Sequence, residues 1–248
     1  MKYIVSFILT GYFIFFNTSC GLDTFYVIDE PYIGEGDHRP VMSDINTDLF
    51  NQEQENYFEF HTFDHDEEGI KFLGTEVYYK IYKDFNVLKN QVNKLESMAS
   101  NEETSYNSPD TLIKSYNYQP LRASGHPEKD ILLPSVGYNQ KVHIRLSDYN
   151  NVYFAGITVD GQNLYGDINR VIPVRNVSNY YSFNFKDLDS DQVPSEDSTT
   201  NPDYDFSGSS TYNYLYVALF AVARAQEPTY APVYSNILFL GAVAIPTK

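Results

Sequence analysis

The sequence predicts a mainly β protein, built as a β-sandwich with one inserted helix. The chain has 23 tyrosines and 17 phenylalanines, residues that favour half-buried pleated strands. Short apolar runs alternate with stretches rich in Asn, Ser, Asp and Thr, a pattern typical of strands joined by turns. Two late runs are apolar on both faces, which indicates strands covered by other layers on both sides. We expect the sandwich to span residues 57–248.

The first two strands are expected to form a hairpin. Residues 57–63 (YFEFHTF) alternate in hydrophobicity, and residues 64–69 (DHDEEG) are typical of a turn. Residues 71–82 (KFLGTEVYYKIY) alternate again. The side chains expected to face the core are Leu73, Thr75, Val77, Tyr79 and Ile81.

A helical stripe then interrupts the strand pattern over residues 85–97. Its apolar residues recur at spacings of three and four, at Val87, Leu88, Val92 and Leu95. Asp84 is a suitable N-cap. The helix is expected to cross one end of the sandwich or to cover a bare sheet face. Tyr78 and Tyr82 point away from the expected core, and we expect them to lie beneath this helix rather than to stack on a sugar or peptide.

The middle of the chain predicts further strands. Residues 111–122 (TLIKSYNYQPLR) form a candidate strand interrupted by Pro120, and residues 125–130 form a turn. Residues 141–146 (KVHIRL) alternate more regularly. Val142, Ile144 and Leu146 are expected inside, with Lys141, His143 and Arg145 facing water.

A hairpin and a long loop follow. Within residues 152–162, the pair Asp160-Gly161 suits a two-residue hairpin turn. Shorter strands are expected at residues 171–175 and 180–185. Residues 186–210 are rich in Ser, Asp and Pro, and we expect a long acidic loop there.

The last two strands are the most apolar segments of the expected domain. Residues 214–223 (YLYVALFAVA) and 236–245 (NILFLGAVAI) are hydrophobic on both faces. Such strands are expected in the centres of sheets. The short strands and polar turns favour an immunoglobulin-like or fibronectin-like topology.

The charge of the chain excludes some partners. The formal net charge is −16 at pH 7. Such a surface repels phosphate backbones, so a nucleic-acid partner is not expected. It also disfavours docking on anionic lipid. An acidic surface is most simply a means of staying soluble.

The N-terminus predicts export. Lys2 provides a basic start, residues 3–16 are apolar, and small or polar residues follow. This order is typical of a secretory signal peptide, expected here over residues 1–19. A membrane-spanning helix is the alternative, but it needs roughly 20 apolar residues.

The single cysteine of the chain, Cys20, lies just past this apolar run. The sequence Thr18-Ser19-Cys20 resembles the lipobox of bacterial lipoproteins. Position 17 is Asn where that family has an aliphatic residue, a departure that spirochaete lipoproteins tolerate. Residues 21–26 (GLDTFY) are similar to the mature start of Treponema-like spirochaete lipoproteins. The resemblance covers about the first 30 residues.

The resemblance implies a lipid anchor. Cys20 would become the first mature residue, with diacylglycerol on its thiol and an acyl chain on its amine. Two or more chains hold a protein stably in a bilayer, whereas one does so only marginally. Residues 20–56 are then expected to serve as anchor and tether. Gly21, where Asp would retain the protein in the inner membrane, implies sorting to the outer membrane of the cell envelope.

Two clusters suggest metal ligands at first inspection. His61, Asp64, His65 and Asp66 lie close in sequence, but four residues of strand span about 13 Å, too far for His61 and His65 to bind one ion. Asp187, Asp189 and Asp191 resemble the start of an EF-hand loop.

The EF-hand pattern then fails. Position six is Gln192 instead of Gly, and position twelve is Ser198 instead of Glu. We expect solvated turns at both clusters, with a looser calcium loop at residues 187–205 as the alternative, where Glu196 and Asp197 add carboxylates.

The sequence contains neither a G-x-S-x-G motif nor a glycine-rich phosphate loop. We therefore expect no cofactor and no catalytic role. The expected function is that of a lipid-anchored envelope protein in adhesion, assembly or binding, with a protein or glycan partner. A periplasmic solute- or glycan-binding lipoprotein is the alternative, and a hydrolase with paired carboxylates is a further one.

Overall fold

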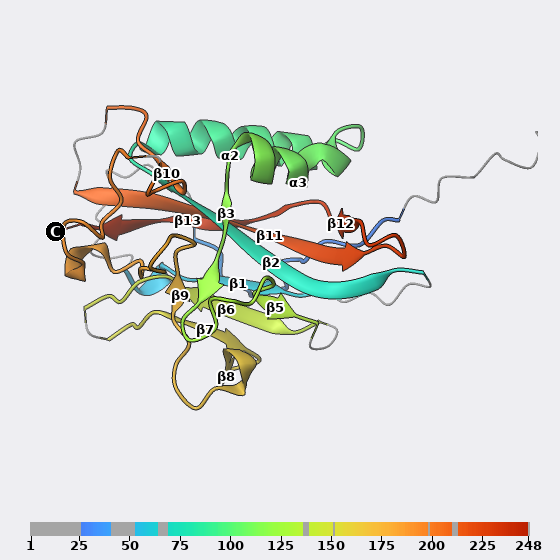
Figure 1. The fold of residues 1–248 in the computed structure, drawn as a ribbon, viewed down its shortest axis with the longest axis horizontal. Coiled ribbons are helices and arrows are strands. Elements are labelled where there is room, and N and C mark those ends of the chain that lie inside the picture. The colour runs from blue at the N-terminus through green and yellow to red at the C-terminus, as the bar shows by residue number, and fades with distance from the viewer. Residues whose placement is uncertain are drawn as a thin grey trace, which may run out of the picture.

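The computed structural model describes residues 26–40, 53–63, 69–135, 139–150, 152–197, 199–209 and 213–247. Two β-sheets stack face to face, and a helix covers the outer face of the larger sheet (Figure 1). The structure thus confirms a mainly β sandwich with one inserted helix. None of the helices in the described ranges has the length and hydrophobicity that crossing a bilayer requires.

The smaller sheet is antiparallel throughout. Across the sheet, its strands are β1 (Phe58–His61), β6 (Lys141–Arg145), β7 (Gly156–Val159) and β8 (Gln162–Asn163). Asp160 and Gly161 join β7 to β8 with φ angles of 48° and 76°. Both values are those that a two-residue type I′ turn requires, so the predicted hairpin is confirmed.

The larger sheet is centred on two long antiparallel strands, β2 (Lys71–Tyr82) and β11 (Tyr214–Gln226). The strands β10 (Tyr204–Asp205), β3 (Gln119–Pro120) and β5 (Leu133–Pro134) pair with β2, and β12 (Pro232–Tyr234) and β13 (Leu238–Pro246) pair with β11. The pair β10–β2 is parallel, which distinguishes this sheet from the purely antiparallel immunoglobulin sandwich. Separately, β4 (Arg122–Ala123) pairs with β9 (Pro173–Val174).

The two apolar runs near the C-terminus take different places in this sheet. The run at 214–223 lies in β11, at the sheet centre as predicted and buried on both faces. The run at 236–245 contributes β13, whose pairing partner among the described strands is β11 alone, so it lies at an edge. Pro40 packs against Gly241 of this strand. The prediction of a central position is therefore wrong for the second run.

The predicted helix is confirmed as α2 (Phe85–Ala99). Asp84 caps it, because its side chain accepts a hydrogen bond of 2.8 Å from the backbone nitrogen of Asn86. The apolar stripe of α2 packs on the outer face of β2, where Tyr82 lies beneath it as predicted and contacts Gln91 of the helix at 3.0 Å. Tyr78 is buried in the same apolar layer, but towards the other end of β2. The buried side chains of the stripe are Leu88, Val92 and Leu95.

A second helical segment replaces part of a predicted strand. The short helix α3 (Ser108–Asp110) continues into the π-helix η4 (Thr111–Ser115). Pro109 at the first turn favours this start, since proline there forfeits no helical hydrogen bond. Within the predicted strand at 111–122, only Gln119–Pro120 and Arg122 are extended, and Arg122 belongs to the strand Arg122–Ala123. The remaining short helices are η2 (Glu53–Glu55), η3 (Ser105–Asn107), η5 (Leu164–Gly166) and η6 (Phe185–Asp187).

The predicted hairpin between the first two strands is wrong. β1 pairs with β6 of the smaller sheet, and β2 belongs to the larger one. The reason lies in burial: β1 buries only the face that carries Phe58 and Phe60, whereas β2 is buried on both faces. A two-sided strand fits the helix-covered sheet, and a one-sided strand fits the sheet that faces solvent.

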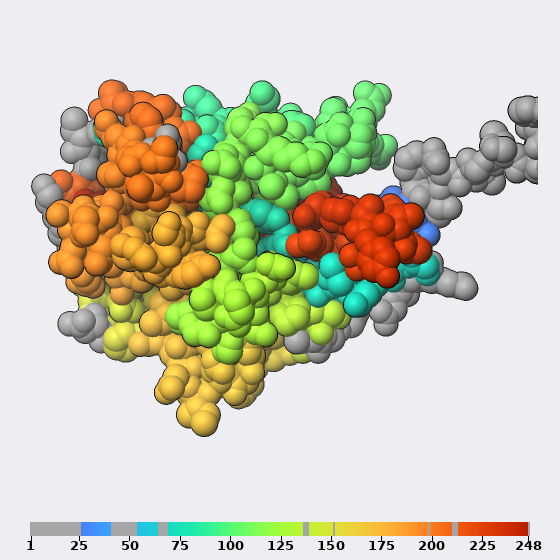
Figure 2. Space-filling model, in the orientation of Figure 1, coloured from blue at the N-terminus to red at the C-terminus, as the bar shows by residue number. Residues whose placement is uncertain are grey.

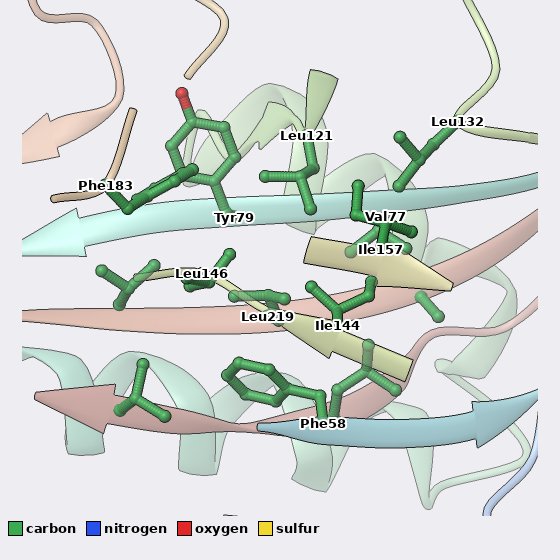
Figure 3. Packing of buried hydrophobic residues seen from close by; sticks show 14 of the residues in the cluster. Phe58, Val77, Tyr79, Leu121, Leu132, Ile144, Leu146, Ile157, Phe183 and Leu219 are labelled. Carbon is green, nitrogen blue, oxygen red and sulfur yellow. The ribbon is translucent and has the colours of Figure 1, made fainter. Parts of the chain in front are cut away.

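The sandwich core lies between the two sheets (Figure 3). Phe58, Ile144 and Ile157 point into it from the smaller sheet, and Val77 and Leu219 do so from the larger sheet. All five are fully buried. Apolar burial contributes about 25 cal/mol per Å², so this layer and the layer beneath α2 supply most of the stability.

Part of the segment expected as a tether belongs to the packed body. Residues 26–40 lie against both sheets: Ile28 is buried, Tyr32 bridges to His61 at the end of β1, and Arg39 pairs with Glu96 of α2 at 3.0 Å. This segment forms no strand, but its contacts fasten it to the sandwich.

The prediction that Arg145 faces water is wrong, whereas Lys141 and His143 on the same strand are partly exposed. The guanidinium of Arg145 lies 5.0 Å from the ring centroids of both Tyr57 and Tyr153. Only 7% of Arg145 is exposed. The alternating pattern correctly predicted which residues of β6 point into the core. Aromatic rings from other segments, however, cover Arg145 on its outer face.

Candidate functional site

The predicted lipidation site, Cys20, lies outside the described residues, as do Asp64, His65 and Asp66. The structure begins at Tyr26, six positions after the cysteine. His61 ends β1, where its Nε2 lies 3.4 Å from a carboxylate oxygen of Asp37. The lipid anchor therefore stays a prediction.

The three loop aspartates are exposed. Asp187 ends η6, and the carbonyl of Asp189 accepts the backbone nitrogen of Gln192 at 2.9 Å in the turn that follows. Among the described residues, no group of three or more His, Cys, Asp or Glu side chains is arranged to hold a metal ion. Calcium binding by Asp187, Asp189 and Asp191 stays an untested alternative.

The acidic loop is instead fastened by a buried ion pair. The guanidinium of Arg175 donates two hydrogen bonds of 2.8 Å to the carboxylate of Asp203, and both side chains are fully buried. Tyr79 donates to the same carboxylate at 2.7 Å, and Asn201 accepts from Arg175 at 2.8 Å. Burial by itself would lower the pKa of Arg175, but the hydrogen bonds and charge of Asp203 raise it. We interpret the cluster as structural because its members satisfy one another.

A polar stripe runs along the helix-facing side of β2, and its members are Glu76, Tyr78, Lys80 and Tyr82. At one end α2 covers the stripe. Lys80 contacts Asp205 at 3.2 Å and donates to the carbonyl of Tyr116 at 2.8 Å. Burial lowers the pKa of Lys80, which Asp205 partly offsets. This end of the stripe is occupied by its own partners.

The other end of the stripe carries the strongest candidate for a ligand site. Glu76 accepts a hydrogen bond of 2.7 Å from Nη1 of Arg224, and its second oxygen accepts from the hydroxyl of Tyr78. Arg224 lies in register with Gly74 across the β2–β11 pair, and its guanidinium is 5.8 Å from the ring centroid of Tyr234. We call Glu76, Tyr78, Arg224 and Tyr234 the Glu76 cluster.

The surface is hollowed in this region. Figure 2 shows part of β2 at the bottom of a depression between the segment near residues 105–118, the loop after residue 120, and the β11–β12 region. The Glu76 cluster belongs to the strands β2, β11 and β12 that meet there. Glu76 and Tyr78 are nearly buried, whereas 29% of the Arg224 side chain is exposed.

The electrostatics of the Glu76 cluster keep its hydroxyls protonated. Burial and the charge of Glu76 raise the pKa of Tyr78, and the same two causes raise that of Tyr234. Burial by itself would lower the pKa of Arg224, but the hydrogen bond and charge of Glu76 raise it. At neutral pH the cluster therefore presents a charged guanidinium and neutral phenols.

The groups of the Glu76 cluster that remain able to form hydrogen bonds are donors. A guanidinium has five N–H donors. Within the described residues Arg224 uses one of them on a side chain, that of Glu76, and its buried Nε has no partner. Both oxygens of Glu76 are already occupied. A ligand that fits here would offer acceptors, such as a carboxylate or a carbonyl, and a face that packs on tyrosine.

Sequence reasoning missed the Glu76 cluster, although one signal for it was present. Glu76 is a charged residue in a strand that the structure buries on both faces, and a buried charge needs a partner. Its partner Arg224 is 148 positions away, just past the apolar run at 214–223. Only the β2–β11 register brings the two together.

Comparison with known proteins supplies no relative: no protein-family model, curated protein or solved structure matches this chain significantly.

Proposed function

We propose that this chain is a lipid-anchored cell-envelope protein with a non-enzymatic role in adhesion, assembly or binding. The observation that carries the proposal is Cys20, preceded by a basic start and an apolar run and followed, six positions later, by a packed β body. The body supplies a stable platform, and the lipid supplies the membrane affinity that an acidic surface lacks.

Replacement of Cys20 by Ala is expected to abolish lipid attachment. Radiolabelled palmitate should label the wild-type protein and a Thr24→Ala control, but not Cys20→Ala. In phase separation with a cloud-point detergent, the variant should move from the detergent phase to the aqueous phase, since no acyl chain remains. Globomycin should block cleavage after Ser19. A wild-type protein without label, or a labelled Cys20→Ala variant, would refute the anchor.

The Glu76 cluster favours one binding role in particular, that of a solute- or glycan-binding lipoprotein. The Arg224 guanidinium is partly exposed beside the ring of Tyr234, and its N–H donors suit an acidic sugar, which offers a carboxylate and an apolar ring face. We therefore propose acidic saccharides as the second candidate ligand class, beside a protein partner.

This second role predicts that D-galacturonate binds and D-galactose does not. The two sugars differ only at C6, where galacturonate has a carboxylate and galactose a hydroxymethyl group, so saturation-transfer NMR on the detergent-solubilised lipoprotein compares them directly. Signals from galacturonate should be lost in the double variant E76Q/R224Q, which removes both charges together. The double variant R39Q/E96Q removes an exposed Arg–Glu pair and should bind normally. Equal signals from the two sugars, or binding retained in E76Q/R224Q, would contradict the role.

A further inference from the structure

The point at which the chain enters the body lies at one end of the sandwich. Tyr26 packs against a small cluster that includes Ile70 just before β2, Phe72 at its start and Ala225 near the end of β11. In Figure 1 the segment that begins at residue 26 reaches the body on the side where β2 starts and where the turn from β11 to β12 lies. We call residues 26–28, 69–71 and 226–232 the proximal end.

Chain length restricts the distance between Cys20 and this end. Six residues span at most about 20 Å, at 3.3–3.6 Å per residue. The strand β2 leads away from the proximal end over 12 residues, roughly 36 Å. A lipid on Cys20 would therefore hold the proximal end near the bilayer surface. The opposite end of β2 would stay tens of ångströms away when the body stands upright.

The proximal end exposes side chains that suit a headgroup layer. Val27 is 74% exposed and Tyr230 is 79% exposed. Tyr230 lies at the tip of a tight turn, closed by hydrogen bonds from its backbone nitrogen to the carbonyl of Glu227 at 2.8 Å and from Glu227 to Ala231 at 3.0 Å. Tyrosine is enriched at membrane interfaces, since its ring is apolar and its hydroxyl is polar.

The charges at this end favour a zwitterionic surface over an anionic one. Within the proximal end, exposed Lys71 is balanced by partly exposed Glu227, so this end carries no excess of positive charge. The residues that follow it directly, Asp29 and Glu30, are exposed and acidic. Attraction to an anionic leaflet requires basic clusters. The contact would thus depend on interfacial packing of Tyr230 and Val27.

We propose that the proximal end lies on the phospholipid headgroups of a zwitterionic bilayer, with Tyr230 and Val27 at the interface. This inference rests on the proposed lipid anchor and adds an orientation to it. The acidic loop that Arg175 and Asp203 fasten then faces away from the membrane. The backbone carbonyl of Asp203 accepts a hydrogen bond from the backbone nitrogen of Ile81, near the far end of β2.

Site-directed fluorescence quenching tests the orientation. In the mature lipoprotein the lipid occupies Cys20, so one introduced cysteine is the only free thiol. Thr229→Cys places a fluorophore at the proximal end. Ser190→Cys places it in the acidic loop, where neighbouring Gln192 contacts Arg175. Both positions are exposed. The labelled proteins are reconstituted into phosphatidylcholine vesicles containing lipid with a nitroxide on the headgroup.

Quenching is expected to be at least threefold stronger at position 229 than at position 190. Tyr230→Asn should reduce quenching at position 229 by at least twofold, since it removes the interfacial ring. Tyr180→Asn is the matched control, because Tyr180 is also exposed and also has a left-handed backbone, with a φ of 51° against 68° for Tyr230. It should leave quenching unchanged.

Vesicle flotation, measured first, separates this inference from the anchor on which it rests. A protein that fails to float with the vesicles refutes the anchor and the orientation together. A protein that floats, but shows equal quenching at the two positions or stronger quenching at position 190, refutes the orientation alone. Quenching at position 229 that survives Tyr230→Asn refutes the interfacial contact.

Discussion

Replacement of Asp203 by Asn is expected to destabilise the protein by about 3–5 kcal/mol, the usual result of leaving one member of a buried ion pair without its counter-charge. Arg175 and Asp203 are fully buried and joined by two hydrogen bonds of 2.8 Å. The variant leaves the guanidinium of Arg175 charged and desolvated. Urea unfolding of the detergent-solubilised lipoprotein, followed by circular dichroism, measures the loss.

Two comparisons make this result specific to the buried pair. Asp110→Asn removes an exposed carboxylate that pairs with Lys114 at 2.8 Å, and it should cost no more than about 0.5 kcal/mol. The double variant R175M/D203L replaces the pair with apolar side chains and should recover part of the loss. An Asp203→Asn variant as stable as Asp110→Asn would show that the pair does not fasten the acidic loop.

Features that depend on neighbouring residues were predictable from the sequence. The helix α2, its cap Asp84, and the turn at Asp160-Gly161 each follow from spacings or residue types within a few positions. The burial of Tyr82 followed from the presence of a helix that needs a sheet face to cover. Local patterns thus determined the type of each long element.

Features that depend on partner choice were not predictable in the same way. The alternating pattern of β1 shows that one of its faces is buried, but it does not identify the strand with which β1 pairs. Its pairing with β6 depends on which of the two sheets it joins. The burial of Arg145 depends on rings from other segments. At residues 111–115 the short apolar run is compatible with strand or helix, and Pro109 in the first turn favours a helix.

The same distinction applies to the candidate site. The predicted lipidation site at Cys20 rests on a contiguous signal, whereas the Glu76 cluster joins residues from three strands. The sequence signal for the Glu76 cluster is a charged residue, Glu76, inside a strand buried on both faces. A buried charge predicts that a partner exists but does not identify it. Arg224 and Tyr234 could be assigned to the cluster only from the strand register.

Gly74→Ala is expected to destabilise the protein by about 4 kcal/mol, through two effects at a bulge in β2. Gly74 has a φ of 141°, a conformation that side chains rarely adopt, and such strain costs roughly 1–3 kcal/mol. An added Cβ would also overlap the carbonyl oxygen of Leu133 and lie 2.8 Å from the Cα of Pro134. Both are backbone atoms of β5, so no side-chain rotation relieves the overlap, which adds roughly 1–3 kcal/mol.

The overlap should act locally as well as globally, because Gly74 and Pro134 are in register between β2 and β5. Hydrogen exchange of the Ser135 amide, which donates to the carbonyl of Leu73 at 3.0 Å, should accelerate before the rest of the sheet responds. Gly125→Ala is the control. Gly125 has a φ of 79° with open space around it, so only strain of about 1–2 kcal/mol remains there. If Gly74→Ala proved no more costly than Gly125→Ala, close contact with β5 would not be what requires glycine at this bulge.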